Sequence, residues 1–435
     1  MSPPVQSGTA VAPLRVPGLS GLGSGASPSP SAAPPHGGPA AALQRHGRVL
    51  ARTLDAPVIP GNRVEVLLDG PATYAAMFDA IDAARDHINL ESYTLEASGP
   101  GEEMARRLIA RRRDGLRVNV LFDAFGSMQT PASYFDAMRA AGVRVCEYNP
   151  LNPLRNTISR ALHLRDHRKL MIVDGRIGFT GGVNISGVYA AGPSGPLRRE
   201  RARVLQSGWR DTHVRIEGPV VAEMQRLFIS HWHRHSCEPL PGARYYPPLP
   251  PAGTQQVGVA AREAGRRRNA FYRSLIGAID AAQQRVLITV AYFVPTRRLM
   301  RSLAAAARRG VEVRMVLPGI SDVWAPLHAG RSHYAWLLQA GVHIHERHDA
   351  MLHAKTCVID GVWATVGSSN LDWRSFLHNA EANVVVLDRD FAAELEAVFW
   401  RDVGCCSEIT AERWQQRGWV PRMQEWLARR FEFFL

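Results

Sequence analysis

The pattern of apolar and polar residues along the chain predicts helices that alternate with short strands, twice in the same order. Each unit opens with apolar residues at helical spacing and ends in a β-branched or apolar run typical of a buried strand. Gly115 and Gly310 end the second predicted helix of each copy. The matching units are residues 74–96, 102–123 and 135–150 in the first copy, and 271–295, 298–319 and 334–351 in the second.

This repeated order indicates a duplicated α/β domain in which helices cover both faces of a largely buried sheet. We expect the first copy over residues 61–240 and the second over residues 266–435. Proline and glycine interrupt any regular element in the stretch between them, so residues 241–265 are predicted as a linker. Residues 1–60 are rich in Pro, Gly, Ala and Ser with little charge, which predicts a disordered tail.

Each copy ends in the same short motif, His-x-Lys followed by Asp-Gly, and this motif contains the only two lysines of the chain. Alternate residues of a strand point to one face, so the His and Lys of each copy should lie side by side. The Asp-Gly pair between apolar runs predicts a tight hairpin turn, which gives each Asp a structural alternative to a chemical role. The motif residues are His167, Lys169 and Asp174 in the first copy, and His353, Lys355 and Asp360 in the second.

A glycine-rich turn that ends in asparagine follows each motif, and it suits a bound anion. Asn184 and Asn370 each lie 15 residues after the motif lysine. The glycines allow backbone N–H groups to approach a ligand, and the Asn amide adds donors. If the copies pack with pseudo-two-fold symmetry, both sets of groups converge on one site.

These groups suit phosphoryl transfer. A neutral imidazole can attack phosphorus and carry it covalently, while a protonated imidazole opposite gives a proton to the leaving alkoxide. The lysines and asparagines would hold the non-bridging oxygens. The arrangement requires no metal and no other cofactor.

Charge and cysteine content narrow the setting. The formal net charge of +13 lies outside the nearly neutral tail and indicates an anionic partner, either nucleic acid or an acidic membrane surface. Five cysteines, widely spaced except for the adjacent Cys405 and Cys406, match neither a disulfide framework nor a zinc site, which favours a reducing compartment. The N-terminus lacks a secretory-signal pattern and no apolar run is long enough to cross a bilayer, so any membrane contact is expected to be peripheral.

The doubled motif with its glycine-rich turns resembles the phospholipase D superfamily, over about residues 61–435. Within that superfamily the chain is similar to bacterial cardiolipin synthases of a short, peripheral type. The stretches that carry this likeness are LFDAFGS at 121–127, WRDTHVRIEGPVV at 209–221 and GSSNLDWRSFLHNAEANVVVLD at 367–388. The resemblance implies two tandem phospholipase D-like α/β/α sandwich domains with pseudo-two-fold symmetry and one shared active site.

The resemblance also implies roles for individual residues. The motif residues named above form the catalytic set, with His167 favoured as the nucleophile and His353 as the general acid. Asp211 and Glu381 correspond to carboxylates that orient the two histidines; their alternative is an ordinary surface ion pair. The copies differ where the first has Gly182 and the second has a serine hydroxyl. The residues expected to bind phosphate are Asn184, Asn370 and Ser368.

The activity implied is a phosphatidyltransferase of the cardiolipin synthase type, acting on phosphatidylglycerol or a related donor through a phosphatidyl-histidine intermediate. The alternative is a phosphodiesterase or nuclease that uses water as the acceptor. Anionic phospholipids and a membrane surface are the expected partners, and nucleic acid is disfavoured. The expected location is the cytoplasmic side of the bacterial inner membrane, bound peripherally.

Several segments are candidates for membrane contact. Basic clusters occur at residues 198–201 and 266–268, and an insertion with apolar residues occurs at 151–164. The C-terminal segment, residues 413–435, mixes tryptophans and phenylalanines with arginines, as interfacial helices do. The alternative for this last segment is a helix that packs back on the second domain.

Overall fold

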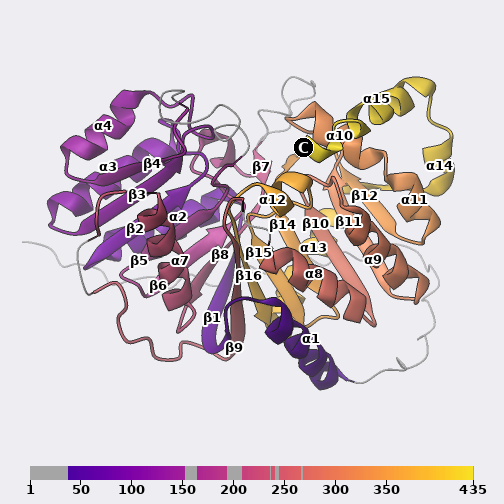
Figure 1. Cartoon of the computed structure of the whole chain (residues 1–435), viewed down its shortest axis with the longest axis horizontal. Helices are drawn as coiled ribbons and strands as arrows, with labels where there is room; N and C mark the ends of the chain where they lie inside the picture. The colour runs from indigo at the N-terminus through magenta and orange to yellow at the C-terminus, as the bar shows by residue number, and fades with distance from the viewer. Residues whose placement is uncertain are drawn as a thin grey trace, which may run out of the picture. The chain divides into compact units, whose positions relative to one another are not determined.

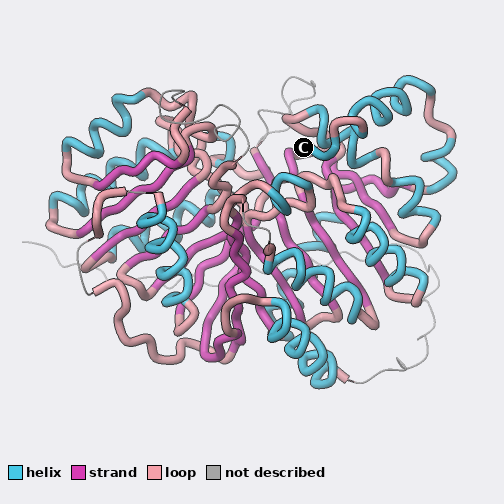
Figure 2. Tube along the Cα trace, viewed as in Figure 1, coloured by secondary structure: helices cyan, strands magenta, loops and turns pink. Residues whose placement is uncertain are grey.

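A computed structural model of the whole chain describes residues 38–151, 164–193, 208–235, 237–240, 244–265 and 268–434. These residues belong to one compact unit. Strands run through its middle and helices flank them in both halves (Figures 1 and 2). The insertion at 151–164 lies outside the described residues except for its two end positions. The cluster at 198–201 lies outside them entirely, as do two arginines of the cluster at 266–268.

The first half supplies strands and helices in the order predicted for one copy, preceded by an additional helix. Its elements are α1 (Pro39–Thr53), β1 (Val58–Leu68), α2 (Asp69–Ala83), β2 (His87–Ser92), α3 (Pro100–Arg113), β3 (Arg117–Asp123), α4 (Ala132–Ala140), β4 (Arg144–Tyr148), β5 (Lys169–Val173), β6 (Ile177–Gly181), the 3-10 helix η1 (Gly187–Tyr189), β7 (Trp209–Arg210), β8 (Thr212–Glu217) and α7 (Val221–Arg234).

The second half repeats this order and adds a C-terminal extension. Its elements are β9 (Gln255–Arg262), α8 (Ala270–Ala281), β10 (Arg285–Val290), α9 (Arg297–Arg308), β11 (Glu312–Pro318), α10 (Trp324–Arg331), α11 (Tyr334–Gln339), β12 (His343–Arg347), β13 (Met351–Leu352), β14 (Lys355–Ile359), β15 (Trp363–Gly367), α12 (Trp373–Leu377), β16 (Glu381–Leu387), α13 (Arg389–Gly404), β17 (Cys406–Ile409), α14 (Ala411–Gln415), α15 (Trp419–Arg429) and the 3-10 helix η2 (Glu432–Phe434).

The described strands of both halves form one continuous sheet of 15 strands, in the order β17-β12-β11-β10-β14-β15-β16-β9-β1-β8-β6-β5-β2-β3-β4. The order reads the same outward from the antiparallel β1–β9 pair in both directions, except for the extra β17. A pseudo-two-fold relation between the copies therefore passes between β1 and β9. The predicted α/β fold and duplication are confirmed.

Helices cover both faces of the sheet, because consecutive strand residues are apolar and point to opposite sides. In the second half, Val286 and Ile288 of β10 pack in the core that α8 and α9 cover, whereas Leu287 packs in the core that α13 covers. The α13 core also takes in α7 and the β5 residues Leu170 and Ile172, so one apolar layer crosses from one half to the other. The layer fixes the motif strands of both copies in a common frame.

The predicted boundaries of the tail and the linker need correction. Residues 39–53 form α1, which begins at Pro39, a residue whose fixed φ suits a first helical position. Ala42 and Leu50 are buried where α1 packs against α8 of the second half. Tertiary contacts of this kind override the weak local signal of an Ala-rich stretch. Residues 1–37 lie outside the described part of the chain.

The predicted linker also contains regular structure. β9 occupies residues 255–262 and pairs with both β1 and β16, so it joins the two halves of the sheet instead of separating them. The strand QQVGVAAR was not recognised in the sequence, because a proline-rich stretch precedes its alternating small and apolar residues. The second copy therefore begins about ten residues earlier than predicted, at β9.

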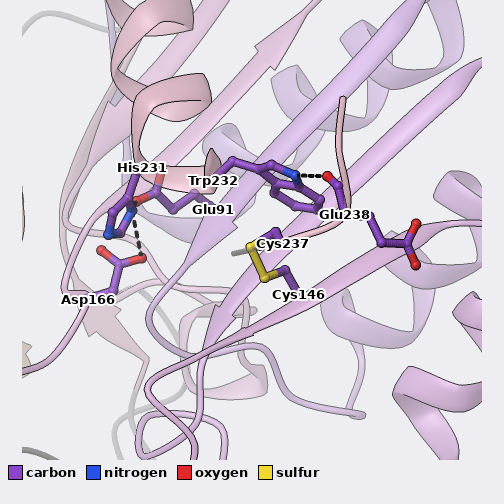
Figure 3. Close-up of a disulfide and its surroundings, with 7 residues drawn as sticks. All are labelled: Glu91, Cys146, Asp166, His231, Trp232, Cys237 and Glu238. Atoms are coloured by element: carbon purple, nitrogen blue, oxygen red, sulfur yellow. Dashed lines mark hydrogen bonds and ion pairs between the residues drawn. A yellow bond between two sulfur atoms is a disulfide. The ribbon is translucent and has the colours of Figure 1, made fainter. Parts of the chain in front are cut away.

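A disulfide between Cys146 and Cys237 contradicts the prediction that the cysteines form no framework (Figure 3). The two residues are separated by 91 positions, and they meet because β4 and the segment after α7 lie side by side. A single pair at this separation leaves no spacing pattern that sequence reasoning could detect. Disulfides persist mainly in oxidising compartments, so the cysteines no longer favour a reducing compartment for this protein.

Among the helices of the described ranges, none has both the length and the apolar content to cross a bilayer.

Candidate functional site

The two motif strands place their histidines at one cavity between the halves. β5 and β14 start at Lys169 and Lys355, so each histidine lies just before its strand. His167 and His353 both line a cavity of about 480 Å³, together with Asn184 and Asn370. The structure thus brings the histidines and asparagines of both copies to one site.

Each histidine is held by a carboxylate of the other half. Nδ1 of His167 lies 3.1 Å and 3.2 Å from the two carboxylate oxygens of Glu381, the first residue of β16. Nδ1 of His353 lies 2.7 Å from Oδ2 of Asp211, which precedes β8. With Nδ1 engaged in this way, Nε2 is left as the reactive nitrogen of each imidazole. The surface ion pair considered for Asp211 and Glu381 does not fit, since both carboxylates are buried.

The pKa values of the two histidines are lowered to different extents. Burial, followed by the charges of Lys169 and Lys355, holds the pKa of His167 well below its usual range. Burial and Lys355 also lower the pKa of His353, but the Asp211 carboxylate opposes this shift. The pKa of His167 is therefore lowered more strongly, and His353 is the imidazole for which a carboxylate offsets part of the shift.

The carboxylates differ in the same direction. Burial raises the pKa of Glu381 to about 7. The pKa of Asp211 is lowered overall, because its bonds to His353 and the charge of Lys355 outweigh the effect of burial. An ionised carboxylate therefore supports His353, whereas His167 faces a carboxyl group that titrates near neutrality.

The lysines are buried next to the histidines, outside the lining of the 480 Å³ cavity, and lack a direct carboxylate partner among the described residues. Nζ of Lys169 donates to the carbonyl of His167 at 2.8 Å, and Nζ of Lys355 donates to the carbonyl of His353. Burial lowers the pKa of Lys169 to about 7 and that of Lys355 to about 8. A bound phosphate diester would supply the missing negative charge and favour both ammonium groups.

The asparagines sit at the end of each glycine-rich turn, as predicted. Nδ2 of Asn184 donates to the hydroxyl of Tyr189 at 3.1 Å, and that hydroxyl lies 3.1 Å from Nδ1 of His353. Oδ1 of Asn370 is buried and has no hydrogen-bond partner in the described part of the chain. This oxygen can only accept a hydrogen bond, so binding of a phosphate oxygen by Asn370 would use its Nδ2 group.

Ser368 lies next to a carboxylate, not at the cavity where phosphate would bind. Its hydroxyl donates to Oε2 of Glu381 at 2.5 Å and accepts from the amide of Ala382 at 3.0 Å. Ser375 donates to the other oxygen of Glu381 at 2.9 Å. The hydroxyl of Ser368 is therefore engaged by Glu381, whereas the sequence predicted a contact with phosphate.

The motif aspartates do not reach the cavity. Asp174 and Asp360 both have positive φ, 53° and 52°, in the hairpin turns at the far ends of β5 and β14. The Asp174 carboxylate accepts the backbone N–H groups of residues 85–87, just before and at the start of β2. The Asp360 carboxylate accepts those of residues 283–285 and also binds Arg45 and His46 of α1. The catalytic grouping of these two residues is thus corrected to a structural one.

Aromatic residues and one arginine complete the cavity, and the sequence interpretation missed them. The ring of Tyr93 lies edge-on to His167 at 4.9 Å, and the ring of Trp209 lies 5.1 Å from His353. Tyr292 and Arg374 also line the cavity. Tyr93 follows β2 and Tyr292 follows β10, which are matching strands of the two copies. The recurrence of a tyrosine at this position could have indicated from the sequence that both belong to the site.

A buried charged cluster lies beneath the first motif (Figure 3). Nδ1 of His231 lies 2.7 Å from Oε1 of Glu91 and 3.8 Å from Oδ2 of Asp166. Arg168 lies beside Glu91 and pairs with Glu263 at 2.9 Å. Burial raises the pKa of Glu91 to about 7, and burial together with Glu91 raises the pKa of Asp166 further. The cluster therefore retains a proton near neutral pH, directly before the first histidine.

Comparison with known proteins agrees with this geometry. A family model described as "Cardiolipin synthase, PLD-like domain" matches residues 77–190 and 275–403. A cardiolipin synthase of Geobacillus kaustophilus is 32% identical over 376 residues, which is 86% of this chain and 72% of that protein. Cardiolipin synthase A of Pseudomonas aeruginosa is 35% identical over 387 residues, 87% of this chain and 74% of that protein.

Solved structures share the fold at low sequence identity. A phosphatidylserine synthase of Haemophilus influenzae matches with a TM-score of 0.63 and 13% identity. The match covers 90% of this chain and 100% of the synthase. A polyphosphate kinase of Porphyromonas gingivalis matches with a TM-score of 0.53 and 13% identity, covering 81% of this chain and 49% of the other. These likenesses concern the fold alone.

Proposed function

The chain belongs to the family of cardiolipin synthases with PLD-like domains, and from this premise we propose that it transfers a phosphatidyl group from phosphatidylglycerol to an alcohol. The observation that carries the proposal is the pair of histidines at one cavity, each held by a buried carboxylate of the other half. The site has a nucleophile, an acid and anion-binding groups.

The proposed reaction has two steps. Nε2 of neutral His167 attacks the phosphorus of phosphatidylglycerol, the bond from phosphorus to the glycerol headgroup breaks, and His353 gives its proton to the leaving alkoxide. A hydroxyl of a second phosphatidylglycerol then returns a proton to His353 and attacks phosphorus, which breaks the phosphorus–nitrogen bond. The products are cardiolipin and glycerol.

The division of roles follows from the carboxylates. A nucleophile must be neutral and a general acid must be protonated, so we assign the first role to His167, whose pKa is lowered more strongly, and the second to His353, which contacts the Asp211 carboxylate. Lys169, Lys355 and Asn370 would hold the non-bridging oxygens through the transition state. In this assignment Glu381 and Asp211 orient the rings and do not contact the substrate.

Two of the three carboxylates that line the cavity support a polyol as the acceptor. Glu96 accepts from Ser186 at 2.5 Å, and Asp322 accepts from the Tyr292 hydroxyl at 2.6 Å. Each keeps one carboxylate oxygen without a hydrogen-bond partner among the described residues. Negative groups would repel a phosphate, whereas they accept hydrogen bonds from glycerol hydroxyls.

We also propose that the protein acts as a peripheral protein of the bacterial inner membrane, because its substrates reside in the bilayer. The Cys146–Cys237 disulfide argues against the cytoplasmic side expected from the cysteine content. Counting free thiols in protein taken directly from cells decides this point: three reactive thiols per unfolded chain indicate an intact disulfide, and five indicate reduced cysteines.

The activity is tested by incubating the purified chain with phosphatidylglycerol vesicles and identifying products by mass spectrometry. We expect cardiolipin and glycerol from the wild type, none from His167→Ala or His353→Ala, and wild-type amounts from His348→Ala, a half-exposed histidine outside the cavity. Phosphatidic acid as the main product would make water the acceptor. Absence of lipid products, with cleavage of nucleic acid instead, would overturn the proposal.

A further inference from the structure

A second, larger cavity lies in the second half, outside the catalytic site. Its volume is about 770 Å³, and α8, α9, α11, α12 and the C-terminal segment form its walls. It shares no lining residue with the catalytic cavity. We call it the arginine pocket, because its lining includes Arg268, Arg273, Arg297, Arg298, Arg301 and Arg429.

The arginine pocket carries a net positive charge, since six arginines face one carboxylate, Glu432, on which Arg297 and Arg429 act electrostatically. Arg273 and Arg298 pair with Asp55 and Asp280, which lie outside the pocket lining. Arg268, Arg297, Arg301 and Arg429 have no ion pair in the described part of the chain. The one carboxylate of the lining, Glu432, is engaged by His333 at 3.1 Å. Several guanidinium groups around a cavity of this size would bind an anion such as a phosphate diester.

Apolar side chains occupy another part of the same lining. Trp336 and Leu377 are more than a third exposed, although both are large and apolar. Trp373 and Phe376 of α12 lie beside them in the lining. A small inorganic anion would leave these groups in water, whereas a lipid would cover them with its acyl chains while its phosphate meets the arginines. The lining is therefore amphipathic in the way that a phospholipid is.

The pocket continues into an exposed apolar helix face. α15 packs Ala428 against α10 and ends at Arg429, which lines the pocket. Its other face exposes apolar residues at helical spacing, among them Trp419 with 72% of its surface exposed and Trp426 with 58%. Tryptophans beside arginines are typical of the interfacial region of a bilayer. The packed face of α15 matches the alternative of a helix that packs back on the second domain, and its exposed face is available for contact with a membrane.

One helix joins the arginine pocket to the catalytic cavity. α12 directs Arg374 to the catalytic cavity and Trp373, Phe376 and Leu377 to the arginine pocket. Val323, at the catalytic cavity, and neighbouring Trp324 of α10 are also exposed. A bilayer that covers α15 and the arginine pocket would therefore also meet the mouth of the catalytic site, since α10 packs against α15.

We infer that the arginine pocket and the exposed face of α15 bind an anionic phospholipid of the membrane as a docking site separate from catalysis. The occupant is a bilayer lipid and not the N-terminal tail, because residues 1–37 contain no acidic side chain to neutralise the arginines. This inference does not depend on the reaction that the enzyme catalyses.

Vesicle sedimentation of the full chain tests the inference. The probes are phosphatidylcholine vesicles with and without phosphatidic acid, and the variant is Arg297→Glu with Arg301→Glu. Both residues are exposed, and an acidic residue at the start of α9 suits the helix dipole, so the variant should fold. The matched control is Arg113→Glu with Arg401→Glu, which makes the same charge change at exposed positions outside the pocket.

We expect the pocket variant to lose at least about tenfold in partitioning to the acidic vesicles, and the control variant to lose no more than about twofold. Equal losses in both variants would indicate diffuse surface charge and overturn the inference, as would wild-type binding by the pocket variant. Saturation of the pocket by glycerol phosphate alone, without any change in vesicle binding, would also overturn it.

A second variant tests the apolar part of the docking site. Trp419→Ser with Trp426→Ser removes two exposed rings and leaves the packed face of α15 intact. We expect about a tenfold loss of vesicle binding, since interfacial binding scales with the apolar area inserted. Binding equal to the wild type would mean that α15 stays outside the bilayer and would overturn that part of the inference.

Discussion

The two copies of the motif present the same reactive groups but are supported in opposite ways. Asp166 and Arg168 flank His167 and join the buried charged cluster with Glu91 and His231. The matching neighbours of His353 are Leu352 and Ala354, which pack in an apolar core. The two copies thus keep the same motif groups, while the residues behind them differ.

The divergence extends to the carboxylates. Glu381 is the longer acid and is held by two serine hydroxyls, whereas Asp211 is the shorter acid and accepts the amide of Thr212 at 2.7 Å. A Cβ atom at Gly182 would lie 2.0 Å from Oδ1 of Asp211, so the first copy cannot carry the serine that the second copy has. The surroundings of two histidines of identical chemistry thus lower their pKa values to different extents.

The largest expected effect separates the two histidines. His167→Ala and His353→Ala should each lower turnover of phosphatidylglycerol by about 10⁴-fold or more, because each acts in both steps. A lipid ester with a p-nitrophenyl leaving group needs no acid in the first step. We therefore expect a burst of nitrophenol from His353→Ala and none from His167→Ala. The reverse result would exchange the two roles.

The next effect concerns the carboxylates. Asp211→Asn should lower kcat/KM by about 10²-fold to 10³-fold, since the amide neither fixes the ring nor stabilises its charge. Asp211 raises the pKa of His353, so its removal lowers that pKa. The rate falls as His353 loses its proton, and the alkaline limb of the pH profile should therefore move to lower pH.

Glu381→Gln is the matched variant for that experiment. It also lowers the rate, but it should leave the alkaline limb in place, because Glu381 contacts His167 and not His353. The measurement is kcat/KM against pH with short-chain phosphatidylglycerol dispersed as monomers. An unmoved limb in Asp211→Asn would remove His353 from the role of acid.

A smaller effect is expected from substitutions at the position where the first copy has Gly182 and the second has Ser368. Gly182→Ser should lower kcat by about 10²-fold, because its Cβ displaces the Asp211 carboxylate by an ångström or more. Ser368→Gly should cost about tenfold, since Ser375 still holds Glu381. Steady-state rates of the two variants give the comparison. Equal losses would mean that the serine and the glycine serve equivalent purposes.

The smallest effect on turnover is expected for the motif aspartates. Asp174→Asn and Asp360→Asn should change kcat by no more than about twofold, since neither residue reaches the cavity. Asp360→Asn should lower the unfolding free energy by about 2 kcal/mol and Asp174→Asn by about 1 kcal/mol, because Asp360 also binds the side chains of Arg45 and His46. Denaturant melts and initial rates test both statements. A large loss of kcat in a stably folded variant would return these residues to the catalytic set.

Much of the fold followed from the sequence because the repeated order of helices and strands is a local pattern. The histidines, lysines and asparagines could be predicted for the same reason, since their spacing is kept in both copies. The pairing of Glu381 with His167 could not, because it joins residues 214 positions apart. α1, β9 and the disulfide escaped prediction for the same physical reason: their stability comes from partners in the other half or far along the chain.

The exchange of carboxylates has a consequence for inheritance. Each half encodes one histidine together with the acid that serves the opposite histidine, so neither half alone specifies a complete pair. A gene split at the junction before β9 would yield two products that regain activity only by associating with each other. A substitution that shifts a histidine in one half therefore has to be matched by a change at the carboxylate in the other half. Selection thus acts on the two halves together.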